Sequence, residues 1–213
     1  GLYKNGTVMS TNFDGATGRI YFDQAFDDGG TLVMHDGTSL YTTTGTDITK
    51  EGAAHIPAGG LAPGIVVMDQ YLFLMATAAD TVGGGSSLAG AIHNSGSATV
   101  DTWAGDFIQP EIKGDRPRGI ARYRNYIAAF GSKTLEFLYN DGTSGTPLSR
   151  FEGMSSNVGC AEGATIAAHD DKIFWVARHP KGGRYVAALL SGFEPERIST
   201  DTIDEYLNGE GTN

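Results

Sequence analysis

Carboxylate side chains are the residues of this sequence with the clearest catalytic potential. Asp23, Asp69, Asp101 and Asp171 each stand beside a short run of apolar or small residues. A pair of carboxylates on either side of a sugar can act as general acid and as base or nucleophile in glycoside hydrolysis. We expect all four at turns rather than inside strands, so a glycosidase or other carbohydrate-active enzyme stays an alternative function.

The remaining nucleophiles and metal ligands lack the neighbours that their chemistry needs. Cys160 lies in NVGCAEG, where Glu162 opposes thiolate formation, and we interpret it as a small buried apolar residue. The His169-Asp170-Asp171 triplet falls where a polar turn recurs along the chain. No two histidines have the spacing of a metal motif such as HExxH. We therefore predict no catalytic residue, no metal site and no cofactor.

Two polar loops resemble ligand-binding loops in composition alone. The Gly83-Gly84-Gly85 loop lacks the Lys-Ser/Thr ending of a phosphate-binding loop, and its surroundings predict a hairpin connection. Residues 140–145, NDGTSG, are rich in oxygen ligands but lack the distal glutamate of a calcium-binding EF-hand. We interpret both as surface turns.

Charge is distributed unevenly along the chain. The sequence has 15 basic and 25 acidic residues, a net charge of −10, which argues against a conventional nucleic-acid-binding domain because such domains neutralise phosphates with Lys and Arg. Residues 1–110 hold three basic and eleven acidic side chains, and residues 111–213 hold twelve and fourteen. The second half begins with a basic run in which Asp115 is the one acidic residue. Its basic members are Lys113, Arg116, Arg118, Arg122 and Arg124. We interpret it as a solvated edge, with a phosphate- or carboxylate-facing patch as the alternative.

Composition sets the class of protein. Glycine supplies 31 of 213 residues, about twice its ordinary share, so the chain is rich in turns. No apolar run reaches the ~20 residues of a membrane helix, and a single cysteine excludes an intrachain disulfide. We therefore expect neither a membrane protein, nor a coiled coil, nor a disulfide-stapled secreted domain.

A repeat of about fifty residues organises the chain. A polar turn leads into two or three strand-like runs separated by glycine turns, with copies from Gly18, Asp69, Arg124 and Asp171. We take four positions as equivalent in these copies: Ile20, Tyr71, Tyr126 and Ile173. Several short strands per repeat with no helix between them are typical of propeller blades.

The repeat predicts an all-β, propeller-like domain over residues 1–213. The predicted domain has about four blade units of short antiparallel strands. Small residues such as Ala128, Ala129, Ala187 and Ala188 are expected where sheets approach closely. One short helix is predicted near the C-terminus, from Asp201 to Leu207, with Ser199 or Thr200 as its N-cap and Gly209 after its end.

Residues 115–207 resemble the packaged-DNA stabilization family, the tail hub or tail accessory proteins of short-tailed bacteriophages. The resemblance rests on IAAFGSKTLEFLY from Ile127, on Gly159-Cys160 followed by a small residue, and on RIST from Arg197 before the helix. A looser similarity covers residues 1–114, through LYKNGTV and LVMHDGTSLYTTTG. Members of the family usually continue past the RIST helix, so the resemblance implies that this chain is a fragment of a longer hub.

The resemblance implies a structural virion protein without catalytic activity. Such a protein is made in the host cytoplasm and assembles in the tail as a homo-oligomeric ring. Its partners are the portal or adaptor and the tail needle or spike, and it retains packaged DNA without binding a specific sequence. In such a ring the basic run from Lys113 to Arg124 can meet the acidic first half of a neighbouring subunit. Besides a carbohydrate-active enzyme, the second alternative function is a generic propeller interaction module of a non-viral protein.

Overall fold

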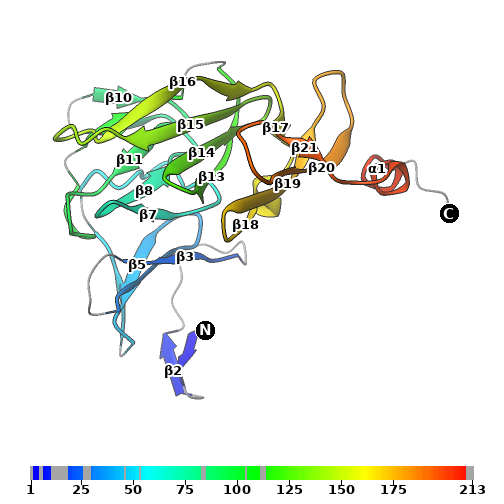
Figure 1. The fold of residues 1–213 in the computed structure, drawn as a ribbon. Coiled ribbons are helices and arrows are strands. Elements are labelled where there is room, and N and C mark those ends of the chain that lie inside the picture. The colour runs from blue at the N-terminus through cyan, green and yellow to red at the C-terminus, as the bar shows by residue number, and fades with distance from the viewer. Residues whose placement is uncertain are drawn as a thin grey trace.

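The computed structural model describes residues 2–4, 7–10, 19–25, 30–45, 47–52, 54–82, 85–103, 105–110 and 114–209. Its central feature is a row of four antiparallel sheets that follow one another in chain order (Figure 1). We call these sheets the first to fourth blades.

The first two blades are four-stranded meanders, with strands paired in the orders β3-β4-β5-β6 and β7-β8-β11-β12. The first blade consists of β3 (Tyr21–Gln24), β4 (Leu32–His35), β5 (Leu40–Thr43) and β6 (Ile48–Lys50). The second consists of β7 (Val66–Met68), β8 (Tyr71–Met75), β11 (Ile92–Asn94) and β12 (Phe107–Ile108).

The third and fourth blades have longer strands. The third blade consists of β13 (Pro117–Tyr123), β14 (Tyr126–Gly131), β15 (Leu135–Asn140) and β16 (Leu148–Ser156). In the fourth blade β17 and β18 both pair with β19, so that this sheet has five strands. They are β17 (Gly159–Cys160), β18 (Ala167–His169), β19 (Lys172–Arg178), β20 (Arg184–Leu189) and β21 (Glu196–Arg197).

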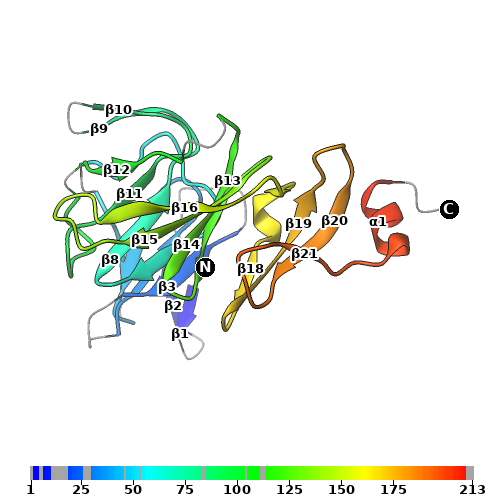
Figure 2. The same ribbon diagram turned by 45° about the horizontal axis from the view of Figure 1, so that its top comes forward.

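Small elements surround the blades. Strands β1 (Leu2–Lys4) and β2 (Thr7–Ser10) form a hairpin near the N-terminus, and β9 (Asp80–Val82) and β10 (Gly85–Ser87) form one that projects from the second blade (Figure 2). A 3-10 helix, η1 (Gly163–Thr165), precedes β18. Helix α1 (Asp201–Leu207) follows the fourth blade and has the predicted bounds, because the Thr200 side chain accepts a hydrogen bond from the amide of Ile203. None of the helices in the described part of the chain combines the length and apolar character that crossing a membrane requires.

Each pair of neighbouring blades encloses its own apolar core. Val33 and Leu72 belong to the core between the first and second blades, and Ile92 and Ile120 to the core between the second and third. The core between the third and fourth blades is the most aromatic, with Phe130 and Trp175 in edge-to-face contact at 5.1 Å. The predicted all-β propeller with about four blades and one short helix is thereby confirmed.

Alanines make the close sheet packing possible, as predicted. Ala128 and Ala129 are adjacent in β14, and their side chains point to opposite faces of the third blade, toward the fourth and second blades respectively. Ala187 and Ala188 in β20 have no exposed surface. A larger side chain at these positions would force the sheets apart, because protein interiors are close-packed.

The predicted equivalence of the repeats holds in three blades and is wrong in the first. Tyr71 and Tyr126 begin the second strand of their blades, and Ile173 lies near the start of β19, the strand that follows the equivalent two-residue turn after β18. Ile20 instead precedes β3, the first strand, and the second strand of this blade begins at Leu32. The reason is a longer connection between β3 and β4, residues 25–31, in place of the two-residue turns that join the corresponding strands elsewhere.

Glycines allow the backbones of neighbouring blades to touch. A Cβ at Gly64, which has φ +100°, would lie 1.9 Å from the carbonyl oxygen of Ile120. One at Gly163 would lie 1.8 Å from the carbonyl oxygen of Arg118. The amide of Ile120 donates to the carbonyl of Pro63 at 2.9 Å, so the approach of the second and third blades includes a direct backbone hydrogen bond.

A buried histidine joins the first blade to the same glycine. His35 has no exposed surface, its Nε2 lies 2.8 Å from the carbonyl oxygen of Gly64, and its Nδ1 accepts a hydrogen bond from the amide of Gly37. This pair of bonds requires the neutral ring with its proton on Nε2. Burial lowers the pKa of His35 from its ordinary value of 6.5, opposed by the bond to Gly64 and by the charge of Asp36.

Replacing Gly64 with alanine is expected to destabilise the fold strongly. The new Cβ would meet the Ile120 carbonyl, and left-handed strain would add to the overpacking, so that we expect a loss of about 3 kcal/mol or more. Gly142→Ala is the matched control, since Gly142 also has positive φ but a Cβ at this position would have no other atom within 4 Å. Strain alone costs about 1 to 2 kcal/mol there. Urea unfolding measures both, and equal shifts of the two midpoints would contradict the explanation.

Acid is expected to weaken the link between the first two blades through His35. The folded-state pKa lies below 6.5, so the unfolded chain takes up a proton first as the pH falls. The contribution of His35 to the free energy of unfolding is therefore complete above about pH 6.5. Below this pH it decreases by up to about 1.4 kcal/mol per pH unit. In urea unfolding between pH 7.5 and 5, His35→Gln should flatten this dependence, whereas His169→Gln, at an exposed histidine, should retain it. Parallel curves for wild type and His35→Gln would refute the assignment.

Candidate functional site

One strand from each blade, or the residue directly before it, borders a small cavity: β3, β7, β13 and β18. Strand β13 contacts both β7 and β18, and β3 contacts β7. The cavity between them has a volume of about 450 Å³ and is lined from all four blades, by Tyr21, Ile65, Ile120 and Ala168 among others. This is the position that the inner strands of a propeller surround.

An acid and an arginine hold the free edge of β7 in this cavity. The carboxylate of Asp23 accepts a hydrogen bond from the amide of Val67 at 2.9 Å, and Arg122 Nη1 donates to the carbonyl of Val67 at 3.3 Å. The first and third blades therefore both bind the peptide groups of one residue in the second. Because an unpaired backbone group at a sheet edge needs a partner, this arrangement explains both side chains structurally.

The four candidate carboxylates lie on different elements. The expectation that all of them stand at turns is wrong for Asp23. This residue lies inside β3, because the strand ends only at Gln24 and the long connection to β4 begins after it. Asp69 and Asp171 are in the turns before β8 and β19. Asp101 is in the loop after β11, where hydrogen bonds from Thr99 and Thr102 lower its pKa. The structure thus gives each acid a separate environment rather than a shared one.

The described part of the basic run lies on and beside one strand, β13. Lys113 lies outside the described residues, Arg116 is exposed just before β13, and Arg118 is half-buried within it. Arg122 donates through Nε to the carbonyl of Arg124, and Arg124 donates to the carbonyl of Ser191 in the fourth blade. The proposed interface role of these residues stays a prediction, and three of the described members are exposed: Arg116, Arg122 and Arg124.

The other sequence candidates are architectural. Cys160 has no exposed surface, as predicted, and burial raises the pKa of its thiol to about 11. His169 ends β18, beside the turn at Asp170. Gly85 begins β10, and the antiparallel pairing of β9 with β10 confirms the hairpin, although Gly83 and Gly84 lie outside the described residues. Among the described residues no three His, Cys, Asp or Glu side chains come together as a metal site.

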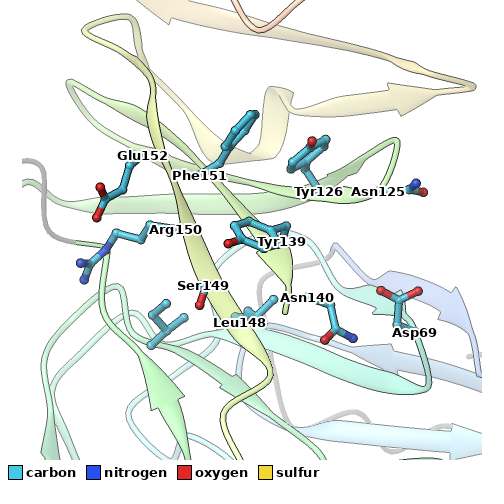
Figure 3. Close-up of a pocket in the computed structure, with 11 residues that line it drawn as sticks. Asp69, Asn125, Tyr126, Tyr139, Asn140, Leu148, Ser149, Arg150, Phe151 and Glu152 are labelled. Carbon is cyan, nitrogen blue, oxygen red and sulfur yellow. The ribbon is translucent and has the colours of Figure 1, made fainter. Parts of the chain in front are cut away.

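A larger groove lies beside the outer strands of the third blade. It has a volume of about 1120 Å³ and an open mouth. Tyr139 occupies its middle, with Arg150 and Glu152 on one side and Asp69, Asn125 and Asn140 on the other (Figure 3). The sequence analysis singled out two of these residues, Asp69 as a carboxylate and Asn140 within the loop 140–145, without joining them in one site. Phe151-Glu152-Gly153 at the edge of the groove was the missed signal, since a glycine inside a strand indicates a bulge.

Comparison with known proteins gives one family. A family model described as "Bacteriophage P22 Gp10, beta-propeller" (Phage_stabilise) matches residues 2–211. No curated protein matches the chain. The match extends across all four blades and helix α1, and so includes both the cavity and the groove.

Proposed function

Because the chain belongs to the bacteriophage P22 Gp10 beta-propeller family, and thus has a structural role in a bacteriophage, we propose that it acts as a tail hub without catalytic activity. The observation that carries the proposal is the family match over residues 2–211, which is nearly the whole chain. In this role the protein joins the portal or adaptor to the tail needle or spike and helps to retain packaged DNA in the virion.

The size of the central cavity restricts the path of DNA in this proposal. The major groove of a DNA duplex is alone about 12 Å wide, whereas the backbones of adjacent blades approach to hydrogen-bond distance around the cavity. A duplex therefore cannot run through the four blades of one chain. We infer that several copies surround the DNA, with the outside of each propeller facing it.

Net charge is consistent with DNA that passes without being held. Each phosphate contact from a Lys or Arg adds to a salt-dependent affinity. The chain has a net charge of −10, and its first half has three basic residues against eleven acidic ones. Arg122 on β13 and Arg124 in the turn after it are already bound to backbone carbonyls.

Exposed apolar side chains at the two ends of the row of blades support a ring of copies. Phe22 on β3 of the first blade is 67% exposed. Beyond the fourth blade, Ile203 and Tyr206 on α1 are 46% and 78% exposed (Figure 1). Two different surfaces on one molecule produce head-to-tail contacts, and such contacts close into a ring when the rotation between copies allows it.

We expect Phe22→Asp to disrupt the ring without affecting the fold. Burying a Phe contributes about 1.5 to 3 kcal/mol, so each contact should weaken about tenfold or more. Leu88→Asp is the matched control, because Leu88 is 63% exposed but lies on neither end of the row. Native mass spectrometry and negative-stain imaging provide the measurement. A wild-type protein that stays monomeric at high concentration would count against the hub, and a ring that tolerates Phe22→Asp would count against this contact.

We further expect Arg116→Glu to weaken ring assembly at low salt. If the basic run meets an acidic surface of the next copy, charge reversal replaces attraction with repulsion, and the difference should shrink between about 0.05 and 0.5 M salt as screening increases. Lys172→Glu, at an exposed lysine of the fourth blade, is the control. Equal assembly and salt dependence in both variants would remove the basic run from the interface.

A further inference from the structure

We propose that the groove beside the third blade is a binding site for a neutral oligosaccharide. The groove is the space around Tyr139 that is bounded by Asp69, Asn125, Asn140 and Glu152 (Figure 3). The proposal depends on the shape and chemistry of this space alone and is independent of the hub function.

The aromatic middle of the groove is held rigidly. Tyr139 is 37% exposed, and its ring meets Phe151 edge-to-face at 6.3 Å. Phe151 stacks on Tyr126 at 5.2 Å with an angle of 13° between the rings, and Phe193 of the fourth blade packs against both. Tyr139 therefore presents a fixed flat surface to solvent, and pre-organisation of this kind lowers the entropic cost of binding.

Polar groups flank the aromatic ring on two sides and still have bonding capacity. Among the described residues, no hydrogen bond or ion pair involves the side chains of Asp69, Asn125 or Glu152, while Asn140 accepts one bond from the amide of Gly142 through Oδ1. Carboxylates accept from hydroxyl groups, and carboxamides both donate and accept. The groove thus offers acceptors and donors on either side of a flat apolar surface.

A bulge in β16 builds one side of the groove. In the pairing of β15 with β16, Glu136 faces Ser155 but Leu138 faces Arg150, so residues 151–154 stand opposite Phe137 alone. Gly153 at φ +83° allows this expansion. The bulge directs Phe151 into the aromatic cluster and leaves Glu152 exposed. Bulges commonly re-aim side chains next to binding sites.

The chemistry of the lining selects among ligand classes. Two carboxylates, Asp69 and Glu152, disfavour a phosphate or another anion, and Arg150 already donates to the carbonyl of Gln109. The polar sides disfavour an apolar ligand, since hydrogen-bonding groups would lose water without replacement. A neutral ligand with many hydroxyl groups satisfies both the acceptors and the flat ring. The volume of about 1120 Å³ exceeds the roughly 300 to 1,000 Å³ typical of a small-molecule pocket, and therefore favours an oligosaccharide over a single sugar.

Saturation-transfer NMR with four neutral hexasaccharides tests the proposal: maltohexaose, cellohexaose, mannohexaose and hexa-N-acetylchitohexaose. We expect at least one to receive saturation at its ring protons. Its affinity should fall about tenfold or more in Tyr139→Ala, from lost apolar contact, and about tenfold in Asp69→Asn, from a lost charged acceptor. Asn is compatible with the φ of +49° at Asp69, so the turn is retained in that variant.

Asp170→Asn is the matched control. Asp170, at φ +50°, occupies the equivalent turn of the fourth blade and lies outside the groove, so hexasaccharide binding should be unchanged. Tetralysine is the contrasting probe, because two carboxylates could instead attract a basic protein segment. The proposal is overturned if none of the hexasaccharides binds, if Tyr139→Ala binds as well as wild type, or if tetralysine alone binds and loses affinity in Asp69→Asn.

Discussion

Direct contact between the backbones of neighbouring blades is the constraint around which the molecule is arranged. Gly64 and Gly163 place two such contacts on either side of β13, against the carbonyls of Ile120 and Arg118. No side chain fits there, so these positions need glycine independently of any turn. The peptide groups left at the free edge of β7 are then bound by Asp23 and Arg122 from the flanking blades.

The same close approach determines where the apolar cores lie. Twisted sheets that touch along their inner strands must diverge farther out, and the space between them has to be filled to native density. Small residues such as Ala121 and Ala128 and large ones such as Phe130 and Trp175 fill the space between the third and fourth blades together. The outermost strands of the third blade extend past this core, and Tyr139 is left partly exposed there.

Local features of the sequence are enough to predict much of the fold. Helix α1 follows from Thr200, Asp201 and Gly209, which are close along the chain, and the turns before Tyr71 and Tyr126 mark two of the blades. The first blade is misaligned by the repeat because its hairpin loop has a different length. The binding of Asp23 to Val67 joins residues 44 positions apart, and no local pattern indicates such a bond. The groove draws on five separate segments of the chain, so only the bulge at Gly153 leaves a trace in the sequence.

A propeller whose blades meet through their backbones is suited to an assembly in which rigidity matters. Blades that are joined through backbone contacts and buried side chains cannot slide on one another without breaking buried hydrogen bonds, which is costly. Such a body transmits load between its outer surfaces as one piece. Binding partners must then use those outer surfaces, and exposed Phe22, the arginine before β13 and the groove around Tyr139 lie on different parts of the molecule. If both proposals hold, a single subunit contacts a neighbouring copy and a separate ligand at the same time, without competition between the two.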